Sequence, residues 1–403
     1  MAHEALRTLL DALEVVRPAF TRPGFVNLVV VFAGWALTSG SHAVTQALVM
    51  TGVAGRRHHE AFHRFFSRGT WDPDEVGRLL FGWIIRYLRE GAAVRVVLDD
   101  TLATKKGPHV FGIGSHLDAV RSTRRQKIFA FGHCWVVLAV LVPVPFSSRA
   151  FALPVLFRLY RTVKSCERAG QPHRKKTELA RELLDVLAAW VGARRVELAA
   201  DSAYCNDTVT RGLPGNFVLF GAMRPDAVLT ALPPARLRKP GRPSRRGRPV
   251  AKPEVIAKDG RRPWLSCQAT LYGVRRTVRY KTVDAQWYRA CGVGLLRIVI
   301  VKVDGGHRDA RLFLYRRHHR GPGHPRDLRR PLGHRGLLPR AQAASRLRRL
   351  QRAQARRRRA HRSLRRLRLH RARALVRRGR APHLHGDSAA SPLVPPQARP
   401  LLR

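Results

Sequence analysis

Several residue types are missing from the last part of this 403-residue chain. Residues 310–403 contain no Glu, Lys, Ile, Thr, Asn, Met, Trp or Cys, and their acidic residues are limited to Asp327 and Asp387. The same segment holds 28 Arg, whereas residues 1–309 use every residue type. The abrupt change predicts a boundary at residue 310. Because like charges without acidic partners oppose compaction, it also predicts a disordered basic tail over 310–403.

Other absences narrow the class of protein. The five cysteines, at 134, 166, 205, 267 and 291, form no Cys-x2-Cys pair, which argues against a structural zinc site and a disulfide framework. The apolar runs 25–37 and 135–146 are too short to span a bilayer, and we see no pattern of a secretory signal peptide. We therefore expect a reduced, cytoplasmic protein with no membrane partner.

Positive charge is in large excess, with a formal net charge of +51. Residues 1–309 carry 49 Lys and Arg against 24 Asp and Glu, so the excess is not confined to the tail. A sustained positive field favours a polyanionic partner, most simply nucleic acid. The alternative is that the charge only keeps the protein soluble, but solubility needs a much smaller net charge than this.

The hydrophobic pattern predicts an α/β protein. Residues 1–91 are expected to be helical, including a helix capped by Asp72, with Pro73 at its first position and Glu75 in a capping box, that ends at Gly91. Strands are predicted at 93–98, 127–142, 149–161, 216–224 and just before Asp201, with a helix at 177–193. Such an order predicts a mixed sheet flanked by helices.

Beyond residue 225 the pattern changes. Residues 231–253 form a basic linker rich in Pro and Gly, and strands are predicted at 271–284 and 295–304. We therefore divide the chain into four parts. These are an N-terminal helical region, a catalytic core, a linker with a β-rich insertion, and the tail, at 1–91, 92–225, 226–309 and 310–403.

Two carboxylates carry the chemical signal. Asp100 and Asp201 lie at the ends of two predicted strands. If those strands are neighbours, both carboxylates project at one sheet edge and attract a hard cation such as Mg²⁺. Paired metal ions activate water in phosphodiester cleavage. The alternative is that both are ordinary surface residues at strand ends.

Four segments, VVLDDTLATKKG, GIGSHLDAVRS, FAFGHCWVVL and ADSAY, occur in an order that resembles the core of DDE-type insertion-sequence transposases with an RNase H-like fold. The resemblance runs through residues 20–309. It implies that Asp100 is the first metal ligand and Asp201 the second. Asp99 and Thr101 would support them, and a β-rich insertion at 226–304 would follow.

The resemblance also implies an activity and its partners. Such enzymes bind double-stranded DNA at the terminal inverted repeats of their element, cleave the strand with Mg²⁺ or Mn²⁺, and join it to target DNA. It further implies a bacterial protein of the cytoplasm associated with the nucleoid, and leaves a homodimer open.

The third carboxylate of this family lies in the pattern Tyr-x2-Arg-x3-Glu-x6-Lys, which this chain lacks. One permitted set of codons for residues 327–343, read from the second nucleotide, encodes TYAARWAIEVCFREPK, which has that pattern. Codons for residues 320–327, read in the same shifted frame, encode EVQDILET. We therefore interpret the tail as the product of a frameshift near Arg308–Leu312, with the missing Glu codon across Arg335 and Gly336. A genuine basic tail is the alternative.

Basic residues in two other segments are candidates for DNA contact. Lys105 and Lys106 follow the first carboxylates and could hold a phosphate near the metal, or lie in a solvated turn. The segment 240–249, PGRPSRRGRP, resembles a minor-groove AT-hook in which Arg242 and Arg248 would enter the groove. A solvated linker is the simpler interpretation of that segment.

Two further signals have plain structural explanations. The segment 59–63, HEAFH, matches the zinc-protease pattern, but its phenylalanine neighbours favour a helix that faces the core. His133 and Trp135 fall in a buried strand and are expected in the core, with a role near the metal site as the alternative for His133.

Two functions remain open. The first is a DDE transposase that binds DNA but is inactive for lack of its Glu, since Glu254 lies in the linker and is a poor substitute. The second is a non-catalytic basic DNA-binding protein, a decayed transposase that acts as a binder or repressor.

Overall fold

The computed structural model describes residues 2–40, 42–105, 107, 110–123, 125–234, 244–271, 274–303 and 310–316. Lys106, Arg242 and residues 317–403 lie outside the described residues, and the predictions that concern them stay predictions.

The N-terminal region is helical, as its sequence predicts. Val31, Leu48 and Phe62 from three of its helices are buried together and form its small apolar core. Its helices, of which η1 is a 3-10 helix, are α1 (Ala2–Leu13), η1 (Glu14–Ala19), α2 (Arg22–Leu37), α3 (Val44–Met50), α4 (Glu60–Ser67) and α5 (Pro73–Ile85).

Helix α5 begins where the sequence predicts and ends earlier. The Asp72 side chain accepts a hydrogen bond from the Asp74 amide and Pro73 occupies the first turn, but Glu75 bonds to Arg78 instead of closing a capping box. The helix ends at Ile85, before the glycine with positive φ at position 91, so the predicted end was wrong. Residues 86–88 continue in turns, which apolar periodicity alone does not distinguish from a helix.

The strands form one mixed sheet of 12 strands within the described residues, in the order β2-β3-β1-β5-β6-β12-β11-β10-β7-β8, with β4 paired to β3 and β9 to β10. The strands are β1 (Val94–Thr104), β2 (Gly114–Leu117), β3 (Phe129–Val144), β4 (Ser147–Tyr160), β5 (Val196–Ala200), β6 (Phe217–Ala222), β7 (Leu229–Thr230), β8 (Pro249–Val250), β9 (Leu265–Leu271), β10 (Val274–Gln286), β11 (Leu295–Val303) and β12 (Ala310–Arg316).

The remaining helices connect these strands. They are α6 (Val163–Glu167), α7 (Lys176–Val191), the 3-10 helix η2 (Ser202–Tyr204), α8 (Asp207–Thr210), α9 (Pro253–Lys258) and α10 (Tyr288–Cys291).

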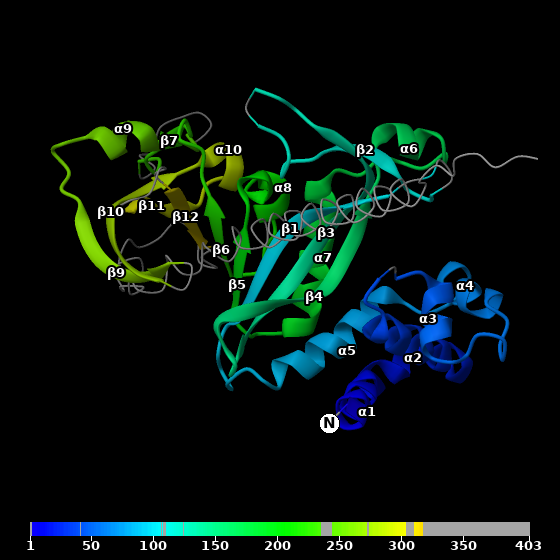
Figure 1. Ribbon diagram of the computed structural model, residues 1–403. Coiled ribbons are helices and arrows are strands. Elements are labelled where there is room, and N and C mark those ends of the chain that lie inside the picture. The colour runs from blue at the N-terminus through cyan, green and yellow to red at the C-terminus, as the bar shows by residue number, and fades with distance from the viewer. Residues whose placement is uncertain are drawn as a thin grey trace, which may run out of the picture. The chain divides into compact units, whose positions relative to one another are not determined.

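The central strands have the arrangement expected of an RNase H-like core. Strands β4, β3 and β1 are antiparallel neighbours, β1 is parallel to β5, and β5 is parallel to β6 (Figure 1). Strand β1 continues to Thr104 instead of ending at residue 98, because its outer half pairs with β3. The two acidic residues predicted to follow this strand therefore lie within it.

One face of the central sheet is covered by α7. Leu98, Leu138 and Leu198 are fully buried together with Leu183 and Leu187 of that helix. Successive residues of a strand point to opposite faces, so the even-numbered residues of β1 lie on this side, which we name the α7 face.

The opposite side of the sheet, which we name the far face, carries the odd-numbered residues of β1. Val97 is completely buried there beside Ala199 of β5, with Leu141 of β3 packed against the pair. The two faces thus have separate apolar clusters.

The β-rich insertion joins the central sheet through β12. Residues 312–316 pair with β6, and residues 310–315 pair with β11 on the other side (Figure 1). The change of composition at residue 310 therefore does not coincide with the end of the sheet, which extends to Arg316.

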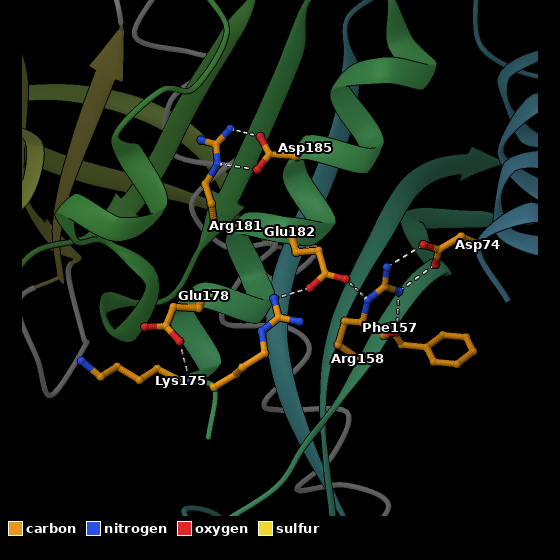
Figure 2. A network of polar contacts seen from close by, with 9 residues as sticks. Asp74, Phe157, Arg158, Lys175, Glu178, Arg181, Glu182 and Asp185 are labelled. Carbon is orange, nitrogen blue, oxygen red and sulfur yellow. Dashed lines mark hydrogen bonds and ion pairs between the residues drawn. The ribbon is translucent and has the colours of Figure 1, made fainter. Parts of the chain in front are cut away.

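Ion pairs connect α5, β4 and α7. The Arg158 guanidinium of β4 donates to both carboxylate oxygens of Asp74, at 2.7 and 2.5 Å, and to Glu182 of α7 at 2.6 Å (Figure 2). Arg174 is a second partner of Glu182. Within the described residues, no helix is long and apolar enough to cross a membrane.

Candidate active site

The structure brings the predicted carboxylates to neighbouring strands. β1 and β5 are adjacent and parallel, with Leu98 opposite Ala200. Asp99 and Asp100 come next on β1, and Asp201 directly follows β5. The expectation that the two strands are neighbours is confirmed, and three carboxylates lie at one end of this strand pair.

Asp100 lies on the α7 face, where three side chains contact it. The Lys176 ammonium lies 2.8 Å from Oδ2, the Tyr204 hydroxyl donates to Oδ1 at 3.0 Å, and the Cys134 thiol lies 3.5 Å from Oδ2. Lys176 opens α7 and Tyr204 closes η2, so this carboxylate connects β1 to both helices.

This environment keeps Asp100 ionised. Burial disfavours the charged form, but the Lys176 charge and the hydrogen bonds outweigh it and hold the pKa of the carboxyl below its ordinary value. Burial and the nearby carboxylate raise the pKa of Tyr204 well above its ordinary value. Burial, opposed in part by Lys176, likewise raises the pKa of Cys134 to about 11. Both neighbours are therefore neutral donors at physiological pH.

Asp99 lies on the far face, since it follows Val97 by two residues in β1. The pairing of β1 with β5 runs to Leu98 opposite Ala200, so Asp99 and Asp201 each follow the last pair directly. Asp99 is 3% exposed, and its Oδ1 accepts the Asp100 amide at 2.9 Å. Asp201 Oδ1 accepts the Ser202 amide at 2.7 Å, so backbone groups orient both carboxylates.

The other predicted site residues are dispersed. Thr101 pairs with Trp135 and is partly buried, on the same face as Asp99. Lys105 is exposed just beyond β1, and its amide donates to the Phe131 carbonyl. Arg248 is in the β-rich insertion, where its carbonyl accepts the Ala231 amide, and not on the strands that carry the carboxylates.

Sequence reasoning missed Lys176 and Tyr204. Lys176 opens a helix that was recognised for its apolar stripe, and nothing local indicates that its ammonium reaches β1. Tyr204 follows Asp201 by three residues, within the segment ADSAY, which was the available signal. His133 is partly buried and contacts the Phe111 carbonyl through Nε2 at 2.7 Å, while Trp135 packs edge-on against Phe157. Both are only partly buried, so the expectation that they lie in the core was wrong.

The side chains of the HEAFH segment contact Arg64 and one another. Glu60 pairs with Arg64, and the His59 and His63 rings are 5.8 Å apart in an edge-on contact. In the part of the chain that the structure describes, no group of three or more His, Cys, Asp or Glu is placed to hold a metal ion.

The carboxylates at the ends of β1 and β5 still fit part of a metal site. Carboxylates on adjacent strands offer the oxygen ligands that Mg²⁺ and Mn²⁺ prefer. The same site lacks a third acidic ligand among the described residues. The donor chemistry therefore fits a divalent ion with an incomplete ligand set.

Comparison with known proteins agrees with this geometry. A family model described as DDE superfamily endonuclease matches residues 18–291, more than half of the chain and inclusive of all three carboxylates. A search of curated proteins finds no match.

Proposed function

The chain belongs to the DDE superfamily endonucleases, and from this we propose that it is a DNA transposase by descent. Its ancestral reaction is metal-dependent strand cleavage and strand transfer at the ends of an insertion sequence. The observation that carries the proposal is the parallel pairing of β1 with β5, which gathers Asp99, Asp100 and Asp201 at one end of the strand pair.

Mg²⁺, or Mn²⁺ in its place, would supply an activated water and charge stabilisation for the phosphodiester when bound. The chain's own part is to hold carboxylates in a fixed geometry. The resemblance assigns ligand roles to Asp100 and Asp201, with Asp99 and Thr101 in support. Lys105 and Lys106 are proposed to contact the DNA backbone near them.

The rest of the chain is proposed to bind double-stranded DNA, both terminal repeats and target. Residues 1–91 would form a DNA-binding region, 92–225 the catalytic core, and 226–309 the linker and insertion, with Arg242 and Arg248 on DNA. The strong basic excess supports this partner and association with the nucleoid. A homodimer is compatible with it.

This polypeptide is proposed to be inactive for cleavage. It contains no Tyr-x2-Arg-x3-Glu-x6-Lys pattern, and Glu254 lies in the first turn of α9 within the insertion. A frameshift explains the loss, with the tail read out of frame. Strand β12 pairs with β6 on one side and with β11 on the other, which supports a change of reading frame after Arg316. The composition alone indicates an earlier position, near Arg308–Leu312.

The frameshift is tested by sequencing the DNA that encodes residues 300–345. An adjacent frame that encodes Tyr-x2-Arg-x3-Glu-x6-Lys beyond Arg316 would support it. If no frame encodes this pattern, the tail is authentic and the non-catalytic DNA-binding protein becomes the better proposal.

Activity is tested with supercoiled DNA and Mg²⁺. The chain as written is expected not to nick it, whereas a chain with the frame restored after β12 is expected to nick it, and Asp201→Asn in that chain to abolish nicking. Robust nicking by the chain as written would overturn the proposed inactivity.

The second candidate is a non-catalytic DNA-binding protein, such as a repressor. The missing Glu pattern favours it. It predicts duplex binding that is unchanged when Asp100 and Asp201 are both replaced by Asn.

A further inference from the structure

A row of aromatic side chains runs along β3 on the far face of the sheet. Phe129, Phe131 and Trp135 occupy odd-numbered positions of this strand, and alternate residues of a strand point to the same face. Trp135 pairs with Thr101, an odd-numbered residue of β1, which places the row on the far face. Phe129 and Phe131 are 63% and 65% exposed, whereas phenylalanine is most often buried.

Neighbouring strands extend this surface. Leu117 of β2 pairs with Phe129 and is exposed as well. Further along β3, the exposed Phe157 of β4 packs edge-on against Trp135, with the ring centres 5.7 Å apart. We name the surface formed by Leu117, Phe129, Phe131, Trp135 and Phe157 the aromatic platform.

Cations lie beside the outer half of the aromatic platform. Arg125 and Lys127 are exposed just before β3 begins. Lys105 is exposed too, and its amide donates to the Phe131 carbonyl at 3.1 Å, so its backbone lies directly beside that of the phenylalanine. A second copy of this basic chain would be repelled here, whereas the phosphates of a nucleic acid would be attracted.

Aromatic rings on an open, basic sheet face suit bases that are not paired. Side chains two residues apart on a strand are separated by about 7 Å, which leaves room for a base on each ring. Sheet-based RNA-binding domains stack two or three bases on aromatic residues in this manner. Stacking rings together with nearby cations are the general composition of single-strand binding sites. Bases inside a duplex are already stacked on one another, so the aromatic platform fits an unpaired strand.

The aromatic platform also leads toward the candidate active site. Val137, two residues after Trp135, pairs with Asp99. Phe131 precedes Val137 by six residues, which is about 20 Å along the strand. A DNA strand that follows β3 from Phe131 would therefore run along the sheet face that carries Asp99.

We propose that the aromatic platform binds an unpaired DNA strand. Its bases stack on Phe129 and Phe131, and its phosphates lie near Lys105 and Lys127. The inference deepens the proposed function and rests on it for DNA as the partner. It does not depend on cleavage, because a chain that cannot nick DNA can still bind a strand that is already unpaired.

Fluorescence anisotropy with the full chain tests this binding. Two labelled probes are compared, an oligothymidine of about 20 nucleotides and a blunt duplex of the same length, at about 200 mM salt to weaken the phosphate contacts that both make. The test variant combines Phe129→Ala with Phe131→Ala. Phe146→Ala is the matched control, because Phe146 is 82% exposed and lies beyond the opposite end of β3.

The test variant is expected to weaken oligothymidine binding by about tenfold or more and to leave the duplex affinity within about twofold, since each ring stacks on one base. Phe129→Tyr combined with Phe131→Tyr should bind oligothymidine within about threefold of wild type, because a phenol ring also stacks. Phe146→Ala should bind both probes as the wild type does.

Unchanged oligothymidine binding in the test variant, or an equal loss for both probes, would overturn the inference. If the wild type binds the duplex and not oligothymidine, the inference falls and the proposed function stands. If it binds neither probe, both fall. Conversion of a dimer into a monomer by the test variant, seen in sedimentation, would assign the surface to a second copy instead.

Circular dichroism checks the fold of each variant. Should the test variant not fold, photo-cross-linking of the wild type to an oligonucleotide that carries 5-iodouracil gives the answer. Links to Phe129, Phe131 or Trp135 are expected, and links confined to other residues would overturn the inference.

Discussion

At the scale of the residue, Lys281 is a buried cation with a structural role. Its side chain is only 3% exposed, and its ammonium donates to the carbonyl oxygens of Ile256, Ala257 and Asp259, the last at 2.6 Å. It also lies 4.6 Å from the centre of the Trp264 ring. One lysine of β10 therefore binds three carbonyl groups at and just beyond the C-terminal end of α9.

Lys281→Met is expected to destabilise the protein by about 2–3 kcal/mol, because buried carbonyl groups lose a charged donor. Lys302→Met, at an exposed position of the neighbouring strand β11, is the matched control and should change stability by less than about 0.5 kcal/mol. Urea unfolding measures both. Equal effects of the two variants would show that the buried contacts contribute nothing.

The carboxylates show what residue-level prediction can achieve. Their position on neighbouring strands followed from the apolar strand before Asp99 and from the motif around Asp201. The contacts of Asp100 on the α7 face did not, because the face of a strand depends on its register with its neighbours, which no local pattern reveals. Lys176 stayed unnoticed for the same reason, since its partner is 76 positions away in the chain.

At the scale of the element, α5 approaches β4 closely at a glycine. A Cβ atom added to Gly77 would lie 2.2 Å from the Val155 carbonyl oxygen, a separation that the backbone of β4 would have to relieve by moving. Gly82, on the same helix, has open space around it.

Gly77→Ala is therefore expected to destabilise the protein by about 1–3 kcal/mol through overpacking. Gly82→Ala should be neutral or stabilise it by up to about 1 kcal/mol through helix propensity. Thermal unfolding of the two variants gives the comparison. A stabilised Gly77→Ala would mean that α5 does not pack on β4 in this way.

The Arg158 network makes the connection between α7 and β4 dependent on pH. Burial opposes ionisation of Glu182, but hydrogen bonds from Arg158 and Arg174 outweigh it and hold the pKa of the carboxyl below its ordinary value. A folded-state pKa below the unfolded one adds stability above the unfolded pKa, near 4.3, and this stability is lost as pH falls through the folded pKa.

Glu182→Gln should thus lower stability at pH 7, and its difference from wild type should shrink as pH falls below about 4. The ion pair of Arg181 with Asp185 is on the same helix with its carboxylate 56% exposed, so Asp185→Asn should cost less than about 1 kcal/mol. Chemical unfolding between pH 3 and pH 7 tests both. If the stability difference between the wild type and Glu182→Gln stayed constant over this range, the effect would come from packing and not from ionisation.

At the scale of the whole molecule, the dominant property is charge. With 77 basic and 26 acidic residues, binding to duplex DNA should be largely electrostatic. Contacts with six or more phosphates would weaken the affinity by about 10³-fold between 50 and 200 mM salt. Fluorescence anisotropy over this range measures the slope, and Asp201→Asn should leave it unchanged. A flat salt dependence would contradict nucleic acid as the partner.

The fold class was predictable because strong local signals coincided. The long apolar strands around residues 130–142 and the amphipathic helix near residue 180 fix an α/β core, and both were recognised close to their true bounds. The short strands β7 and β8, two residues each, have no periodicity to detect. Strand β12 was missed because its Arg-rich context has the composition of a disordered segment.

The position of β12 has a consequence for how the polypeptide matures during synthesis. β6 ends at Ala222, and its partner β12 begins only at Ala310, so the ribosome must complete the whole insertion before the two halves of the sheet can join. Until then β6 and β11 both present unpaired edges, which invite aggregation. A nascent chain whose reading frame changed before residue 310 would lack β12, so β6 and β11 would keep their unpaired edges. A chain whose reading frame changes after Arg316 contains β12, and it can therefore close its sheet and accumulate as a folded product.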